Sequence, residues 1–138
     1  MNKILVRFKK LDERAIAPTY GSDCAAGADL YALADKEITI GAGETAFVHT
    51  GIAAEIPENL VGLVYARSGL ACKKGLAPAN KVGVIDSDYR GEIMVALYNQ
   101  SNEPRTIADG ERIAQLVIAP YLRAEFTECE TLSDTARG

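Results

Sequence analysis

Hydrophobic residues recur along this chain in short segments of strand length, either alternating with polar residues or in continuous runs. The alternation between residues 4 and 9 predicts a first strand with one apolar face. Further strands are predicted at residues 38–40, 45–49, 51–54, 60–66, 83–85, 92–99, 113–119 and 124–127. Turns rich in Gly, Pro, Asn and Asp separate these segments. The pattern predicts an all-β fold, an antiparallel sandwich or jelly roll.

One segment, Ser68–Gly75, has the signals of a short helix. Ser68 is predicted to cap its start, and Gly75 is predicted to end it in a left-handed conformation. No repeat, low-complexity tract or linker interrupts the pattern. Residues 1–138 are therefore predicted to form a single domain, with 129–138 as a C-terminal arm.

Three of the predicted strands, at 60–66, 93–98 and 113–119, are apolar on both faces. In an antiparallel sheet one face normally meets water. The second apolar face needs cover, and a domain of 138 residues has little of its own to spare. We therefore predict an oligomer.

Composition and charge restrict the classes of function. The net charge is −4, which argues against a nucleic-acid-binding surface, because such a surface needs a basic face. No segment resembles a signal peptide or reaches membrane-spanning length. Cys24, Cys72 and Cys129 form no C-x-x-C pair, which predicts buried, reduced thiols in a cytoplasmic protein. His49 is the only histidine, so no mechanism uses two imidazoles, and a surface or strand position is predicted for it.

The stretch from Gly83 to Gly91 carries the densest chemistry. It is predicted to be a tight hairpin in which a short strand, a polar bend and the strand from Glu92 follow one another. Residues 86–90 hold two carboxylates, a phenol and a guanidinium. The alternative is a solvated polar turn, because turns collect Asp for local hydrogen bonding.

Two other stretches have the residues of an anion site. Arg67, Ser68 and Gly69 stand where a strand meets a helix N-terminus, and they offer a cation, a hydroxyl and close access to the backbone. The alternative is an N-capping Ser beside a surface Arg. Gln115 interrupts a buried strand, where an unpaired amide costs about 1–3 kcal/mol. Its side chain is therefore predicted to bond either neighbouring backbone or a ligand.

Four stretches, in chain order, resemble the first four motifs of the homotrimeric dUTPase family. They read AGADLYA (26–32), ARSGLA (66–71), NKVGVIDSDYRG (80–91) and GERIAQ (110–115). The resemblance covers the chain from about Pro18 to Gly138. The family's fifth motif is a Gly-rich tail that opens with Arg-Gly, and this sequence ends at Arg137-Gly138, where that motif begins.

The resemblance implies a role for each residue near the base and the sugar. Asp86 would hold and activate the water that attacks the α-phosphorus of dUTP. Tyr89 would pack against the deoxyribose and leave no room for a 2′-hydroxyl. Uracil would be read by main-chain groups of Gly83, Val84 and Ile85, with Asn80 at the entrance.

For the phosphates, the resemblance implies binding by a set of polar residues: Arg67, Ser68, Gly69, Gln115 and Arg137. Asp29 would hold a water on Mg²⁺, which sits on the triphosphate. Arg90 would fix the hairpin, and Arg112 would form an ion pair or a subunit contact.

At the level of the assembly, the resemblance implies a distorted jelly roll and a homotrimer with sites between subunits. The reaction would limit uracil incorporation into DNA and supply dUMP for thymidylate synthesis. Three alternatives remain: a dCTP deaminase of the same fold, a nucleotide-binding regulator with little turnover, and a jelly-roll carbohydrate binder or capsid-like domain.

Overall fold

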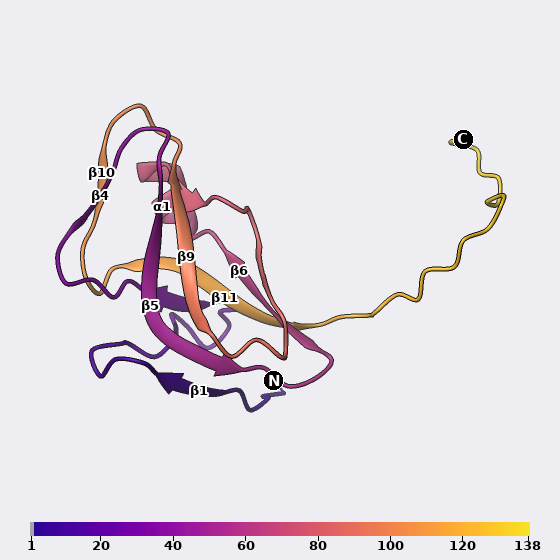
Figure 1. The fold of residues 1–138 in the computed structure, drawn as a ribbon, viewed down its shortest axis with the longest axis horizontal. Coiled ribbons are helices and arrows are strands. Elements are labelled where there is room, and N and C mark those ends of the chain that lie inside the picture. Colours follow the sequence, from indigo (N-terminus) through magenta and orange to yellow (C-terminus); the bar gives the residue numbers. More distant parts are fainter. Residues whose placement is uncertain (1) are drawn as a thin grey trace.

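Strands dominate the structure, a computed structural model that describes residues 2–138 (Figure 1). The elements are β1 (Arg7–Lys10), β2 (Thr19–Tyr20), β3 (Ala28–Tyr31), β4 (Ile38–Ile40), β5 (Thr45–Glu55), β6 (Leu60–Tyr65), α1 (Ser68–Lys74), β7 (Leu76–Pro78), β8 (Gly83–Ile85), β9 (Glu92–Asn99), β10 (Arg105–Ile107) and β11 (Arg112–Pro120). Within the described residues, α1 is the one helix. The predicted all-β class with a single short helix is confirmed.

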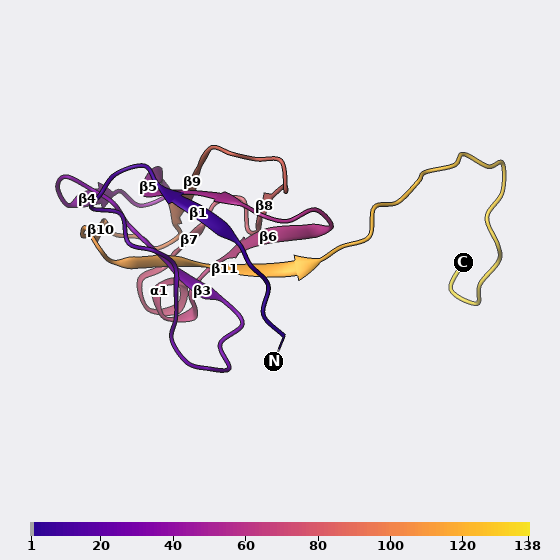
Figure 2. The same cartoon turned by 90° about the horizontal axis from the view of Figure 1, so that it is seen from below.

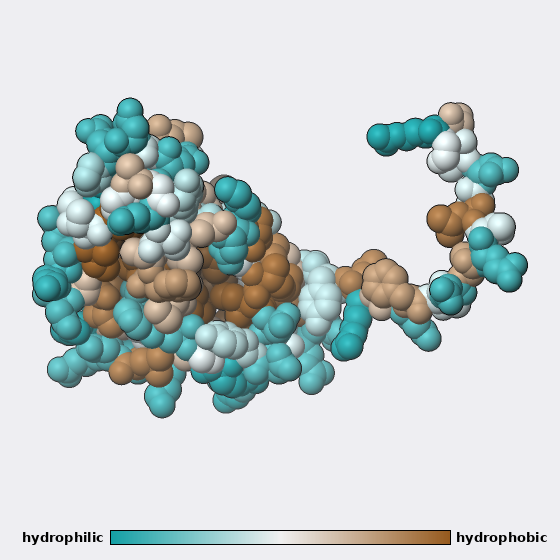
Figure 3. Space-filling view, turned by 45° about the horizontal axis from the view of Figure 1, so that its top comes forward, coloured by the Kyte–Doolittle hydropathy of each residue, from teal (hydrophilic) through white to brown (hydrophobic). Residues whose placement is uncertain are grey.

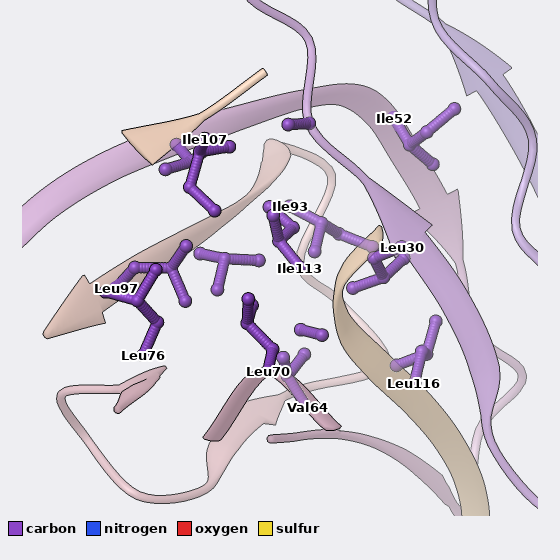
Figure 4. Close-up of a cluster of buried hydrophobic side chains, with 14 of the residues drawn as sticks. Leu30, Ile52, Val64, Leu70, Leu76, Ile93, Leu97, Ile107, Ile113 and Leu116 are labelled. Atoms are coloured by element: carbon purple, nitrogen blue, oxygen red, sulfur yellow. The ribbon is translucent and has the colours of Figure 1, made fainter. Parts of the chain in front are cut away.

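The strands form three antiparallel sheets. A four-stranded sheet has the order β1-β5-β9-β7, and a five-stranded sheet has the order β2-β3-β11-β6-β8. A small third sheet pairs β10 with β4. Strands from all three sheets send side chains into one buried cluster, so the two larger sheets share a core. In Figure 4 the buried side chains of this core point toward one another from strands on both sides.

Helix α1 begins at Ser68, one residue earlier than it would if Ser68 were its N-cap. Arg67 holds the N-cap position with an extended backbone, and no side chain makes a capping hydrogen bond. The predicted capping role of Ser68 is therefore wrong, because Ser68 is itself the first helical residue. The predicted end is confirmed, since Gly75 adopts φ 69° and its N–H reaches the carbonyls of Leu70 and Ala71.

The two strands predicted at 45–49 and 51–54 are one strand, β5. The register against β9 shifts between His49 and Ala53, which is the mark of a bulge. Gly51 lies inside the bulge at φ 69°, a conformation that favours glycine. Gly51 therefore does not begin a second strand, as the sequence predicted, but allows the single strand β5 to bend.

The predicted hairpin of residues 83–99 is also wrong. β8 pairs with β6, whereas β9 pairs with β5 and β7, so the two segments belong to different sheets. The six residues between Ile85 and Glu92 carry the chain from one sheet to the other. Neither Gly83 nor Gly91 has a positive φ.

The ends of the chain depart from the predicted strands. β1 begins only at Arg7, and its residues are exposed. Residues 121–138, including the predicted strand 124–127, contain no strand and are exposed throughout. Figures 1 and 2 show this segment leaving the end of β11 and running away from the body. Figure 3 shows hydrophobic side chains at the surface of the body near this exit and along the segment itself.

The predicted burial of the thiols is wrong as well. Cys24, Cys72 and Cys129 are free, as predicted, but all three are exposed. His49 lies on β5 with its side chain largely exposed, in agreement with the prediction. No helix within residues 2–138 is long and apolar enough to cross a membrane.

The fully buried Asn99 joins the end of β9 to the small third sheet. Its amide group donates to the carbonyls of Ile40 and Glu103, at 2.9 Å each, and its side-chain oxygen accepts from the Ser101 N–H and hydroxyl. An Asn99→Ala change leaves these groups without partners and is expected to cost roughly 3 kcal/mol of unfolding free energy. Urea unfolding at fixed protein concentration measures the loss. The exposed neighbour Asn102→Ala is the control and is expected to change stability by less than about 0.5 kcal/mol.

Candidate active site

A cleft of about 370 Å³ lies where the chain crosses between the two larger sheets. One wall comes from β8 and the loop after it, and the other comes from residues 92–96 of β9. Six residues predicted to meet base, sugar or water line this cleft: Asn80, Gly83, Val84, Ile85, Asp86 and Tyr89. The structure therefore brings the whole predicted base-and-sugar group together.

The backbone of β8 is available to a ligand in this cleft. β8 is the outermost strand of the five-stranded sheet and pairs only with β6. Its other edge therefore carries N–H and C=O groups without a strand partner among residues 2–138. Val84 exposes 64% of its surface beside these groups, and Phe47, on β5, exposes 70%. An edge of this kind can hydrogen-bond a planar base between apolar side chains.

The loop between β8 and β9 is held by Arg90. The guanidinium of Arg90 donates to the carbonyls of Ser87 at 2.6 Å and Tyr89 at 3.2 Å, and it also reaches the Glu55 carboxylate at 3.4 Å. The Tyr89 N–H closes a turn onto the Asp86 carbonyl at 3.1 Å. These bonds support the prediction that Arg90 fixes this segment, and they leave the Asp86 carboxylate exposed at the cleft.

Glu92 connects the cleft to the bulge of β5. One carboxylate oxygen accepts from Nδ1 of His49 at 2.8 Å, and the other accepts from the Gly51 N–H at 2.8 Å. Its backbone carbonyl accepts from the Tyr89 hydroxyl at 2.7 Å. Burial of the Glu92 carboxyl acts to raise its pKa, but the hydrogen bonds from His49 and Gly51 outweigh it and hold the pKa below its ordinary value.

Sequence reasoning missed Glu92. The partners of its carboxylate lie more than 40 residues away in the chain, at His49 and Gly51. An acid directly after a glycine carries no signal for such long-range contacts, so only the pairing of β5 with β9 brings them together.

A second polar cluster lies on the five-stranded sheet, where Asp29, Gln115 and Tyr65 stand side by side on β3, β11 and β6. The Asp29 side chain is only 14% exposed. One of its oxygens lies 3.0 Å from Nε of Arg67, and the other lies 3.7 Å from a guanidinium nitrogen of Arg112. Of the two roles predicted for Arg112, an ion pair or a subunit contact, the structure shows the ion pair, with Asp29.

Gln115 bonds neighbouring backbone, one of the two predicted alternatives. Its amide nitrogen donates to the Ala66 carbonyl at 2.9 Å. Gly27 makes room for this side chain, because a Cβ at position 27 would collide with the Gln115 amide oxygen. Gln115 is thereby fixed beside the strand end that leads into Arg67.

The remaining predicted phosphate residues lie apart from the cleft. Ser68 and Gly69 are exposed at the start of α1, and Arg137 is exposed on the C-terminal segment. Among residues 2–138, the cleft lining includes neither these three nor Asp29, Arg67 and Gln115. A single chain therefore separates the predicted base-and-sugar group from the predicted phosphate group.

The donors for a metal ion are limited. Within residues 2–138 no three His, Cys, Asp or Glu side chains gather closely enough to hold an ion by themselves. Mg²⁺ commonly keeps several waters and takes substrate phosphates plus one or two carboxylates. The single partly accessible carboxylate of Asp29 fits an ion that arrives on a triphosphate, and it does not fit a protein-only cage.

Comparison with known proteins now adds to this geometry. The family model for dUTPase matches residues 13–138. The chain belongs to the dUTPase family. It is 49% identical to the deoxyuridine 5′-triphosphate nucleotidohydrolase of Desulfitobacterium hafniense, over 99% of this chain and 91% of the relative. It is 48% identical to the protein of the same name from Rickettsia bellii, over 96% of this chain and 89% of the relative.

Solved dUTPase structures have the same fold. The Staphylococcus bacteriophage 80alpha dUTPase with dUpNHpp superposes with a TM-score of 0.88, at 27% identity, over 99% of this chain and 95% of that one. The dUTPase from phage phi11 of S. aureus gives a TM-score of 0.84, at 25% identity, over 96% of this chain and all of that one. As a member of this family the chain is an enzyme of the dUTP diphosphatase class.

The lowered pKa of Glu92 predicts a pH-dependent contribution to the stability of this dUTPase-family chain. A carboxyl whose folded pKa lies below its unfolded value stabilises the fold above the unfolded pKa, and the effect is lost as the pH falls through the folded pKa. Glu92→Gln is therefore expected to lose about 1–2 kcal/mol of unfolding free energy at pH 7. The difference from wild type should shrink below about pH 4.

Denaturant unfolding of wild type and Glu92→Gln across pH 3–8 measures this dependence. Glu58→Gln, at an exposed turn, is the matched control, because it removes the same charge without the two long-range hydrogen bonds. If wild type remains more stable than Glu92→Gln by the same free energy down to pH 3, the lowered pKa of Glu92 does not contribute to stability.

Proposed function

We propose that this chain hydrolyses dUTP to dUMP and pyrophosphate, with Asp86 activating the attacking water. The observation that carries the proposal is the cleft, which joins the Asp86 carboxylate, the Tyr89 ring and the unpaired backbone edge of β8. The names of the two bacterial relatives and the complex of the phage dUTPase with dUpNHpp support a deoxyuridine triphosphate as substrate.

Uracil enters the cleft and pairs with the backbone of Gly83, Val84 and Ile85, while Asn80 lies at the entrance. Because main-chain groups recognise the base, they select it by its shape as well as by its hydrogen bonds. The extra methyl of thymine would need room beside a closely packed strand, where even a Cβ on Gly83 would lie only 3.2 Å from the Val64 side chain. Tyr89 stands against the deoxyribose and excludes a 2′-hydroxyl.

Asp86 orients a water and accepts its proton as the water oxygen bonds to the α-phosphorus. The bond between the α-phosphorus and the oxygen bridging to the β-phosphate breaks, and pyrophosphate leaves. Hydrogen bonds hold the turn of residues 86–90 and thereby keep the Asp86 carboxylate in place. Positioning of the water therefore supplies much of the rate enhancement.

The phosphates bind to the second cluster and its neighbours. The hydroxyl of Ser68, the backbone at Gly69 and the side chains of Arg67 and Gln115 meet the α- and β-phosphates, and Arg137 meets the γ-phosphate. Asp29 would help to hold, through a water, a Mg²⁺ ion that arrives with the triphosphate. When bound, this ion offsets phosphate charge that an acidic protein of net charge −4 would otherwise repel.

The working enzyme is a homotrimer of single-domain chains with a distorted jelly-roll fold, in which residues 1–138 form the domain and 129–138 its arm. Sites lie between subunits, which reunites the two groups of residues that one chain keeps apart. Exposed apolar side chains support the assembly. Phe47 and Val84 are exposed on the body, and Leu122 and Phe126 expose 99% and 95% on the C-terminal segment.

In the cell, the reaction would limit uracil incorporation into DNA and supply dUMP for thymidylate synthesis. A cytoplasmic location belongs to the same proposal. The three free cysteines are consistent with it, because reducing compartments keep thiols unpaired.

The central test is Asp86→Asn. The amide keeps the size of the side chain but cannot take the proton, so kcat for dUTP should fall at least roughly 100-fold while dUTP still binds. Pyrophosphate release with dUTP, dCTP, dTTP and UTP, with and without Mg²⁺, measures both activity and selectivity. Asp88→Asn is the matched control, because Asp88 lies in the same loop but lines a different hollow with Arg7 and Glu58. Near-normal turnover in Asp86→Asn would remove Asp86 from the mechanism.

The assembly has its own test. Sedimentation velocity at micromolar concentration is expected to show a species of three times the 14.8 kDa mass of one chain. A sample that is fully active and sediments only as single chains would contradict a site shared between subunits.

A further inference from the structure

The Tyr89 ring rests against a position that has no side chain. A Cβ built on Gly91 would lie 2.5 Å from the Tyr89 hydroxyl oxygen, 2.7 Å from Cζ and 3.0 Å from Cε1. Carbon atoms do not approach this closely, so any side chain at position 91 forces the ring to move. The backbone itself does not demand glycine there, because Gly91 does not have a positive φ.

The far end of the ring is anchored as well. The Tyr89 hydroxyl donates to the Glu92 carbonyl at 2.7 Å, and the Glu92 carboxylate is tied to His49 and Gly51 in the bulge of β5. The ring therefore touches Gly91 along its edge and Glu92 at its tip, where Gly91 directly precedes β9 and Glu92 is its first paired residue. A side chain held by such a frame keeps one position without help from a ligand.

We infer that Gly91 and the Glu92 carbonyl form a seat for the Tyr89 ring, and that this seat determines the sugar selectivity of the site. The inference rests on the proposed function in that Tyr89 contacts the deoxyribose. Gly91 and Glu92 are positioning residues, since they act through Tyr89.

The seat holds the ring against the sugar, so a ring displaced away from the sugar lowers selectivity. Such a ring admits the 2′-hydroxyl and improves UTP as a substrate relative to dUTP. A ring pushed into the cleft would instead take the room of both sugars and lower kcat/KM for dUTP and UTP together. Outward displacement therefore lowers the ratio of kcat/KM for dUTP to kcat/KM for UTP, and a change of one methyl in such a pocket is worth roughly tenfold.

A double-mutant cycle on the full chain tests this seat. Pyrophosphate release from dUTP and UTP is measured for wild type, Gly91→Ala, Tyr89→Ala and the double variant. Gly91→Ala is expected to lower the dUTP/UTP ratio roughly tenfold when Tyr89 is present. In the Tyr89→Ala background it should change the ratio less than about twofold, because the added methyl then meets no ring. Gly21→Ala is the matched control, since a Cβ there meets nothing within 4 Å.

The outcomes separate the inference from the function on which it rests. If Gly91→Ala leaves the ratio unchanged while Tyr89→Ala lowers it, the seat is wrong and the role of Tyr89 stands. Equal effects of Gly91→Ala in both backgrounds also overturn the seat, because the methyl then acts without the ring. If Tyr89→Ala leaves the ratio unchanged, the proposed role of Tyr89 and the seat both fail.

The hydrogen bond to Glu92 has a separate variant that carries little risk of misfolding. Tyr89→Phe keeps the ring and loses only the bond to the carbonyl. It is expected to lower the dUTP/UTP ratio by a smaller factor than Tyr89→Ala, with the thermal midpoint of unfolding unchanged. A ratio equal to that of wild type would remove the Glu92 carbonyl from the seat.

Discussion

The passage of the chain from one sheet to the other between Ile85 and Glu92 is the constraint on which the site depends. Because β8 and β9 do not pair with each other, they leave a cleft between them, and β8 keeps one edge of its backbone free. A hairpin of the same sequence would have used those N–H and C=O groups within the ladder and closed the cleft. The space of the cleft, into which the proposed function places the base, thus follows directly from the sheet topology.

Both ends of this crossing are tied to β5, the longest strand. Arg90 joins the loop carbonyls to Glu55 at the end of β5, and Glu92 joins the start of β9 to the bulge at Gly51. The loop between them carries an exposed acid and an exposed phenol, which gain nothing from burial. Hydrogen bonds to β5 therefore hold the loop that carries Asp86 and Tyr89. Side chains on a loop held in this way can position a substrate for reaction.

Charge explains the arrangement of the second cluster. Asp29 is mostly buried and lies between the guanidinium groups of Arg67 and Arg112, so each charge has a partner in the absence of ligand. In the proposed function, a triphosphate meets at this cluster cations that Asp29 already orients. In the proposed trimer, this cluster faces the cleft of a neighbouring chain and, in an otherwise acidic protein, supplies local positive charge to the phosphates.

The sequence by itself determined most of the longer strands, the short helix, the four motifs and the family, because these depend on local periodicity and on residues close together in the chain. It also identified six residues that line the cleft. It misjudged Ser68, Gly51 and the segment 83–99, where the same local signal fits two backbone arrangements. Only the tertiary structure decided which sheet each strand joins, how Glu92 reaches His49, and why Tyr89 needs a glycine beside it. Glu92 and His49 lie 43 residues apart, and the fit of Tyr89 to Gly91 depends on how the loop is folded, so neither contact can be derived from pattern or spacing.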